Sequence, residues 1–171
     1  MSKDQYRSSL RAAARGLWLG ALSAYEFPDA FGASLDRYLR EAFDEGMAYY
    51  GIEPEDYTDE DIKVFQDFLM NQYSYLPGLT DFIVSQGKVF GGSLESVLVR
   101  VEMWVNRYDE IRDIARARAG ADEKQEWQGT PGKQHCETCY GLIGWVKRGS
   151  YWQRFYDETG IRPKAVGGAL I

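Results

Sequence analysis

The stretch "SLESVLVRVEMWVNRYDEIRDIARARAG", residues 93–120, decides the fold of this 171-residue chain. Its apolar side chains recur every three or four residues over about six turns, the spacing that places them on one face of an α-helix. We predict a helix over 94–118, with Ser93 as its N-cap and Gly120 as its stop. The apolar face comprises Leu94, Val97, Leu98, Val101, Trp104, Val105, Tyr108, Ile111, Ile114 and Ala115, and the charged face comprises Arg100, Glu102, Arg107, Asp109, Arg112 and Arg116. Such an apolar face is typical of the core of a helix bundle and not of a cofactor-binding segment.

The same periodicity predicts further helices upstream. They cover residues 4–26, about 28–50, a segment after Thr58 that carries Ile62, Phe65, Leu69, Gln72 and Tyr73, and about 79–90. Thr58 followed by Asp61 resembles a capping box at the start of the third of these helices. Leu76-Pro77-Gly78 is expected to end or kink that helix, because proline cannot continue a helix. The predicted fold class is mainly α, a bundle of four to five helices.

The composition changes after Gly120, where glycines, aromatic residues and both cysteines concentrate. We predict a helical body over 1–120 and a small α+β module carrying the Cys-x-x-Cys pair over 121–171. The turn signals between short apolar runs support this division. In chain order the expected elements are a strand at 126–128, a turn at 129–132, a tight loop at 136–139, a strand at 145–147 and a helix capped by Ser150 that ends at Gly160.

Charge is distributed unevenly along the chain. Residues 1–120 carry 13 Lys and Arg against 20 Asp and Glu, whereas residues 121–171 carry 7 against 6. An acidic body argues against direct binding of nucleic acid, because contacts to the phosphate backbone need clustered Lys and Arg. The apolar content of 44%, with 15% aromatic residues, supports a packed core.

The sequence also argues against a membrane partner. No apolar run approaches the roughly 20 residues that span a bilayer. The stretch "GLWLGALSAY", residues 16–25, follows basic residues as a targeting segment would, but it is short, contains two glycines and lacks a clear cleavage site. We interpret it as part of an amphipathic helix and expect a protein that is cytosolic or otherwise not secreted.

The candidate metal ligands are His135, Cys136 and Cys139, which include the only histidine and both cysteines of the chain. A Cys-x-x-Cys pair in a tight loop is the usual half of a zinc knuckle. Tetrahedral zinc takes four ligands, so this stretch supplies a half-site for zinc. A redox role would need the pair at the start of a helix in a βαβ unit, which the helical pattern does not predict. Two inert buried thiols are the third alternative, and the pattern alone leaves the three open.

Motifs for catalysis are absent from the sequence, and we predict no catalytic residue and no enzyme. His135 would have to serve any Ser-His-Asp triad, and no serine stands in a G-x-S-x-G elbow. The stretch "GTPGK", residues 129–133, lacks the spacing of a phosphate-binding loop and is followed by Gln134.

One motif resembles that of a known family. Trp127, Cys136, Cys139, Leu142 and the segment 144–146 follow the pattern W-x(8)-C-x-x-C-x-x-L-x-G-x-V. This pattern is similar to the C-terminal motif of tailed-phage minor head, or head morphogenesis, proteins. The stretches "KRGSYW" (147–152), "GIRP" (160–163) and "LVRVEMWVNRY" (98–108) resemble a subgroup of that family in prophage-like gene clusters.

The resemblance implies a strand that carries Trp127, a Cys-x-x-Cys turn and a second strand. In the family a further Cys-containing segment commonly completes a metal or structural cluster, but no Cys or His follows Cys139 here. The resemblance implies a structural protein of the phage head, in the virion or the bacterial host cytoplasm, that contacts portal or capsid proteins and can self-associate. Two alternatives stay open: a metal-dependent enzyme with zinc on Cys136 and Cys139 and Glu137 or Glu126 as its base, and a helical adaptor of unrelated origin.

Overall fold

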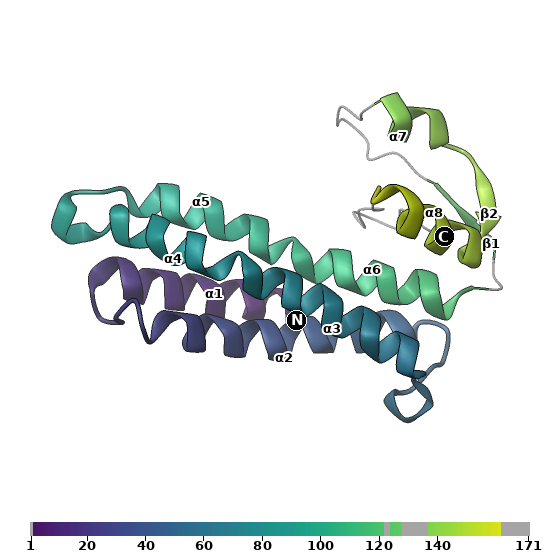
Figure 1. Ribbon diagram of the computed structural model, residues 1–171, viewed down its shortest axis with the longest axis horizontal. Coiled ribbons are helices and arrows are strands. Elements are labelled where there is room, and N and C mark those ends of the chain that lie inside the picture. The colour runs from purple at the N-terminus through teal and green to yellow at the C-terminus, as the bar shows by residue number, and fades with distance from the viewer. Residues whose placement is uncertain (1, 122–123, 128–136, 162–171) are drawn as a thin grey trace. The chain divides into compact units, whose positions relative to one another are not determined.

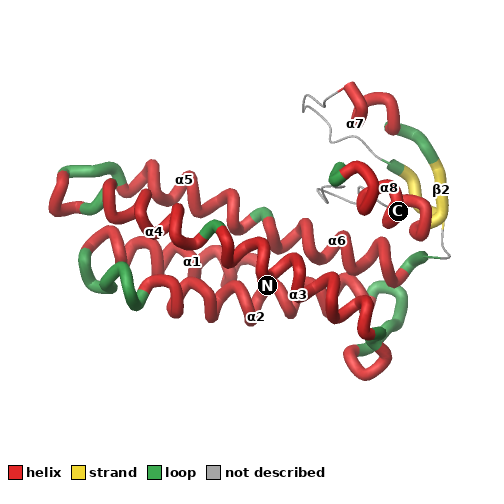
Figure 2. Tube along the Cα trace, viewed as in Figure 1, coloured by secondary structure: helices red, strands yellow, loops and turns green. Residues whose placement is uncertain are grey.

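The structure is a computed structural model that describes residues 2–121, 124–127 and 137–161 (Figure 1). The chain is mainly helical, as predicted, and helix accounts for most of the described trace in Figure 2. The elements in chain order are α1 (Ser2–Leu19), α2 (Phe27–Ala48), the short 3-10 helix η1 (Pro54–Asp56), α3 (Asp59–Ser74), α4 (Leu76–Ser85), the 3-10 helix η2 (Lys88–Phe90), α5 (Leu94–Val105), α6 (Arg107–Ala119), β1 (Lys124–Glu126), α7 (Glu137–Leu142), β2 (Val146–Arg148) and α8 (Gly149–Thr159).

The first helix ends earlier than the sequence pattern predicts. Gly20 has φ of +76°, and its N–H donates to the carbonyl of Leu17 at 3.0 Å. The N–H of Ala21 donates to the carbonyl of Gly16 at 2.8 Å, which completes a Schellman motif. The predicted extension to residue 26 is therefore wrong, because a glycine in the left-handed region ends the helix at Leu19.

The predicted helix over 94–118 is divided into α5 and α6 by Asn106 alone. Asn106 keeps right-handed helical angles, with φ −68° and ψ −17°, and its N–H donates to the carbonyl of Glu102 at 3.2 Å. The interruption is thus local to one residue, and the apolar face predicted from the periodicity is largely buried on both sides of it.

Both predicted helix caps are present. The Oγ of Ser93 accepts a hydrogen bond from the N–H of Ser96 at 3.2 Å. At the start of α3, the Oγ1 of Thr58 accepts from the N–H of Asp61 at 3.2 Å, and the Asp61 carboxylate accepts from the N–H of Thr58 at 3.0 Å. This reciprocal pair is a capping box with Asp in place of Glu.

Replacing Ser93 by alanine is expected to lower the free energy of unfolding by about 1 kcal/mol, because the Ser96 N–H loses its acceptor. Urea denaturation followed by circular dichroism measures this loss. Ser93→Asp, which keeps an acceptor at the cap, serves as the control and should stay within about 0.5 kcal/mol of the parent. Equal stability of the alanine variant and the parent would show that the cap contributes nothing.

Helix α3 ends at Ser74, just before Leu76-Pro77-Gly78, in line with the predicted helix end, and the segment itself begins the next helix. Tyr75 separates α3 from α4, and Pro77 lies in the first turn of α4, where its missing N–H has no helical partner to lose. The predicted helix over 79–90 accordingly starts earlier, at Leu76, and ends at Ser85. The 3-10 helix η2 follows it.

The chain divides into two compact units. Unit 1 comprises Met1–Glu41 and Ile62–Tyr108, and unit 2 comprises Ala42–Asp61 and Asp109–Ile171. The helices α2, α3 and α6 contribute residues to both. The predicted division into a body over 1–120 and a module over 121–171 stays a prediction.

The core of unit 1 is rich in aromatic side chains. The buried Tyr6 hydroxyl donates to the carbonyl of Trp104 at 3.1 Å. Burial raises the pKa of Tyr6, although the charge of Arg107 opposes this effect. Phe31 meets Trp104 edge to face with ring centroids 5.3 Å apart. These contacts connect α1, α2 and α5 within the unit.

On the surface of unit 1, a carboxylate links two helices. The Glu102 carboxylate lies between the guanidinium groups of Arg7 and Arg11, at 3.3 and 3.0 Å. These contacts join α1 and α5, which lie side by side.

In unit 2 the end of α2 packs against α6 at Gly46. A Cβ atom added to Gly46 would lie 2.1 Å from the carbonyl oxygen of Arg112 and 2.7 Å from the Cβ of Ala115. The two helix backbones therefore approach more closely than any side chain at position 46 would allow.

Candidate functional site

The predicted metal ligands are only partly within the described residues. His135 and Cys136 lie outside them, and the structure describes the backbone of Cys139, which belongs to α7. The tight loop predicted at 136–139 is corrected here, since a helix begins at Glu137, where a carboxylate suits the positive end of the helix dipole. Among the described residues, no group of three or more His, Cys, Asp or Glu could hold a metal ion.

The donor set of this stretch does not complete a structural zinc site. Two thiolates and one imidazole are one ligand short of the usual four. Cys139 belongs to the first turn of α7, and no further Cys or His follows it in the sequence to serve as the fourth donor. Zinc therefore stays a prediction for a half-site.

The other motif residues form a small core in unit 2. Trp127, Leu142 and Trp152 are buried together with Ala117 of α6. The rings of Trp127 and Trp152 have centroids 5.1 Å apart, and Phe155 of α8 meets both indoles edge to face at 6.1 and 6.0 Å. Aromatic pairs at such distances stabilise a core beyond the area that they bury.

Backbone hydrogen bonds fix the register of this core. The strands β1 and β2 are antiparallel, and Glu126 pairs with Val146. The N–H of Trp127 donates to the carbonyl of Trp145 at 2.9 Å, and the N–H of Gly144 donates to the carbonyl of Trp127 at 2.9 Å. Gly144 has φ of +85°, a value that L side chains rarely adopt. This backbone conformation explains why glycine occupies the last position of "L-x-G" in the motif. Both predicted strands are present, each shifted by one or two residues.

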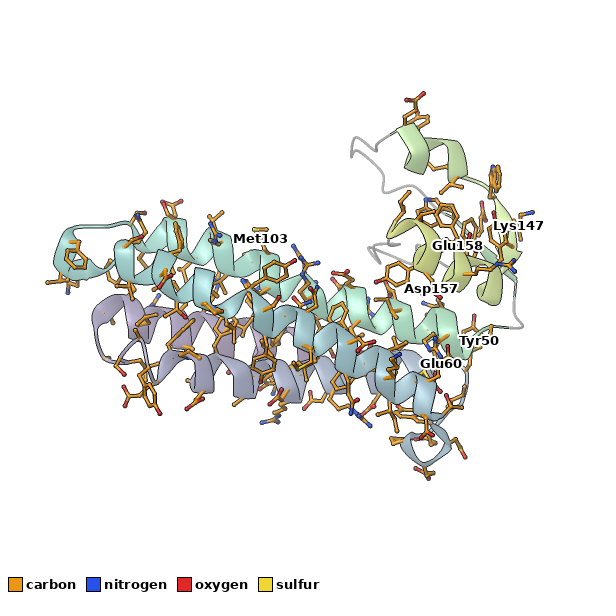
Figure 3. The ribbon with its side chains drawn as sticks, viewed as in Figure 1. Tyr50, Glu60, Met103, Lys147, Asp157 and Glu158 are labelled. Carbon is orange, nitrogen blue, oxygen red and sulfur yellow. The ribbon has the colours of Figure 1, made fainter. Side chains whose placement is uncertain are left out.

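The segment from α7 to the start of β2 carries four exposed apolar side chains, which we call the α7–β2 face. It consists of Tyr140, Ile143, Trp145 and Val146, whose side chains are 69, 41, 46 and 54% exposed. The ammonium group of Lys147, labelled in Figure 3, lies 5.7 Å from the Trp145 ring centroid and 5.3 Å from that of Tyr151. Contiguous patches of exposed apolar side chains are typical of protein-contact surfaces.

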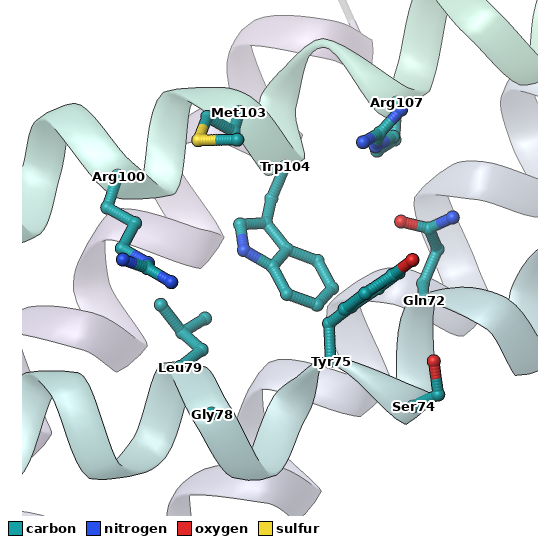
Figure 4. A pocket seen from close by; sticks show the side chains of 9 residues that line it. All are labelled: Gln72, Ser74, Tyr75, Gly78, Leu79, Arg100, Met103, Trp104 and Arg107. Carbon is teal, nitrogen blue, oxygen red and sulfur yellow. The ribbon is translucent and has the colours of Figure 1, made fainter.

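A pocket of about 440 Å³ lies in unit 1 between α5 and the α3–α4 corner (Figure 4). Its lining residues are Gln72, Ser74, Tyr75, Gly78, Leu79, Arg100, Met103, Trp104 and Arg107. Sequence reasoning missed this pocket, because it placed Trp104 in the core and Arg100 and Arg107 on a solvated face. Two arginines seven residues apart, on either side of a tryptophan, were the signal in the sequence.

A buried ion pair ties α3 to α6 within unit 2. The Nε of Arg118 lies 2.8 Å from an Asp61 carboxylate oxygen, and both side chains are almost fully enclosed, with 12 and 11% exposed. Burial alone would raise the pKa of Asp61, but hydrogen bonds from Thr58 and Arg118 outweigh it and lower the pKa. These bonds are all internal to the fold, so we assign the pair to stability and not to chemistry.

Comparison with known proteins assigns this chain to no family. No protein-family model, no curated protein and no solved structure matches this sequence. In the part of the chain that the structure describes, no helix has both the length and the apolar character needed to cross a membrane.

Proposed function

We propose that this chain is a structural protein of a phage or prophage head, of the minor head or head morphogenesis type, that acts through contacts with other proteins. Its place would be the virion or the cytoplasm of the bacterial host, and its partners portal or capsid proteins. The proposal starts from the resemblance of the motif that runs from Trp127 to Val146 and from the absence of any catalytic motif in the sequence.

The observation that carries the proposal is the packing of the motif. Trp127 and Leu142, which are fixed positions of the pattern, share one buried cluster, and Gly144, with a positive φ, lies in the turn between Leu142 and β2. A chance match of scattered residues would have no reason to converge in this way. The two strands that the resemblance implies correspond in chain order to β1 and β2, whereas the helix α7 lies where the resemblance implies a turn.

The α7–β2 face supports a role in protein contact. The side chains of Trp145 and Val146 are about half exposed. Tryptophan and tyrosine are enriched among the residues that dominate binding energy in protein interfaces. A partner that covered Tyr140, Ile143, Trp145 and Val146 would remove their apolar surface from water.

Co-expression with the portal and the major capsid protein encoded by the same gene cluster tests the proposal. We expect the tagged chain to co-purify with one of them at a fixed ratio. The double variant Trp145→Ser/Val146→Ser should weaken this association by about tenfold or more, because loss of two central apolar contacts removes at least about 1.4 kcal/mol. The backbone bond from Trp127 to the carbonyl of Trp145 does not depend on the side chain.

The matched control is Val89→Ser/Phe90→Ser in η2, which also removes one valine and one aromatic ring that are highly exposed. It should bind like the parent. Absence of association with either head protein would contradict the proposal, and so would an equal loss in both double variants. Association with an unrelated cellular protein instead would favour the helical adaptor.

A further inference from the structure

The outward side of α5 carries two apolar side chains that are mostly exposed. Val99 is 65% exposed, and Met103, which projects from α5 in Figure 3, is 62% exposed. Ser96, also exposed, precedes Val99 by three residues. We call Ser96, Val99 and Met103 the α5 seam, because their spacing of three and four residues is that of the contact positions of a coiled coil. The buried side of the helix is formed by a different set, Val97, Val101, Trp104 and Val105.

One acidic and one basic side chain border the α5 seam. Glu95 and Arg100 are both exposed and stand five positions apart on α5. In a helix of 3.6 residues per turn, this separation places them about 140° apart around the axis. All three seam residues fall within that sector, so Glu95 borders the seam on one side and Arg100 borders it on the other.

Both bordering charges are open to a partner. Within the described residues, neither Glu95 nor Arg100 forms an ion pair. The guanidinium carbon of Arg100 lies 4.7 Å from the centroid of the Phe82 ring. That contact uses the flat face of the guanidinium and leaves the N–H donors at its edge for a carboxylate. A surface that presents one unpaired charge of each sign can therefore complement a copy of itself.

The order of the two charges selects a parallel arrangement of two such helices. When two helices pack in the same direction, the residue that borders the contact on one side pairs with the residue five positions later on the facing side of the partner. Glu95 would then meet Arg100 of the partner subunit, and two-fold symmetry repeats this pair. Antiparallel packing would instead bring the two acidic sides together and the two basic sides together, which is unfavourable.

We propose that two copies of this chain associate through the α5 seam. Their α5 helices pack in parallel, Val99 and Met103 bury their apolar surface against the same side chains of the partner, and Glu95 pairs with Arg100 on both sides of the contact. The apolar contact supplies the driving force, and the charge pairs set the direction of packing. The inference does not depend on the phage-head proposal, since that proposal rests on residues 127–152 and α5 belongs to unit 1.

Sedimentation equilibrium of the full chain tests the inference. We expect a monomer–dimer equilibrium with a Kd of about 100 μM or tighter. Glu95→Arg and Arg100→Glu each create two like-charge contacts in the symmetric dimer and should weaken it by about tenfold or more. Glu55→Arg and Lys63→Glu change the net charge by the same amounts at exposed positions outside α5, so these controls should leave the Kd within about twofold.

Recombining the two charge reversals tests the pairing and its direction. In an equimolar mixture, a Glu95→Arg chain and an Arg100→Glu chain regain opposite charges at both contacts, so the mixture should associate about as tightly as the parent. The double variant Glu95→Arg/Arg100→Glu should recover as well, because its exchanged charges meet again across a parallel pair. An antiparallel pair would keep like charges together in the double variant and would not recover.

A pair of methionine variants tests the apolar part of the contact. Met103→Gln should weaken the dimer by about fivefold, whereas Met70→Gln, at a methionine of α3 that is 67% exposed, should change the Kd by less than about twofold.

Three results would overturn the inference: a parent chain that is monomeric up to about 500 μM, a mixture that associates no better than its two components, or equal effects of the α5 variants and their controls. Circular dichroism of each variant establishes that the helices are intact. The co-expression test with head proteins uses the α7–β2 face, so either result can fail without the other.

Discussion

Gly46→Ala is expected to destabilise the protein by about 3 kcal/mol or more, although alanine is the better helix former. On helix propensity alone the change would stabilise α2 by about 0.5–1 kcal/mol. The added Cβ would lie 2.1 Å from the Arg112 carbonyl oxygen, well inside van der Waals contact, and a backbone atom cannot turn away as a side chain can. The helices α2 and α6 must separate, which opens the packing of buried Phe43, Met47 and Ile111.

Gly78→Ala is the matched control for this prediction. Gly78 is also a helical glycine, in α4, but a Cβ atom there meets nothing within 4 Å. This variant should be as stable as the parent or up to about 0.5 kcal/mol more stable. Urea denaturation of the three proteins measures the difference. A Gly46→Ala protein that equals or exceeds the parent in stability would show that α2 and α6 do not meet at this position.

Asp61→Asn is expected to lower the free energy of unfolding at neutral pH by about 2–3 kcal/mol. The substitution removes the charge that pairs with Arg118 and leaves that guanidinium largely buried, with Glu60 at 3.9 Å as its remaining partner. Breaking one side of a buried ion pair typically costs about 3–5 kcal/mol, and Glu60 compensates part of this loss. The asparagine oxygen still accepts from the Thr58 N–H, so the cap is weakened and not abolished.

The pH dependence of stability tests whether the charge of the Asp61 carboxylate causes the stability difference between the parent and Asp61→Asn. The pKa of Asp61 is lower in the folded protein than in the unfolded chain, so its contribution is fully present well above the ordinary aspartate value of about 3.9 and is lost as the pH falls through the folded pKa. The difference in stability between the parent and Asp61→Asn should therefore shrink as the pH is lowered from about 7 to about 3.

Asp67→Asn provides the control, because Asp67 is an exposed carboxyl on the same helix. It should change stability by less than about 0.5 kcal/mol at neutral pH. Urea titrations at several pH values at constant ionic strength measure all three proteins. A difference between the parent and Asp61→Asn that stays constant over this whole pH range would contradict the assigned role of the charge.

Much of the helical fold could be predicted because its signals are local. The spacing of apolar residues from Leu94 to Ala115 is repeated often enough to specify a helix and its buried face. Ser93 and the Thr58–Asp61 pair act on backbone groups within three residues, so their roles follow from the sequence alone. Gly120 also ends α6 as predicted.

The errors arise where the sequence allows two local outcomes. Gly16 and Gly20 both interrupt the first apolar pattern, but only Gly20 has a positive φ, and that value depends on the Schellman bonds formed around it. Pro77 is equally compatible with the end of one helix and the first turn of the next. The helix at Glu137–Leu142 contains Gly141 and is short, so no periodicity could reveal it.

The candidate sites depend on contacts between distant residues. Gln72 and Trp104 line one pocket from helices that the sequence places far apart, and no pattern within either helix indicates their meeting. The motif that contains Trp127 and Leu142 could be recognised as a pattern, yet its shared core with Trp152 and Ala117 depends on how the chain folds back.

The inclusion of Ala117 in the tryptophan cluster has a practical consequence for dissecting this chain. A fragment that starts at the change of composition after Gly120 would leave one wall of the cluster behind and expose indole surface to solvent. Truncations intended to study the cysteine-bearing end by itself should instead retain α6 from Asp109 onward.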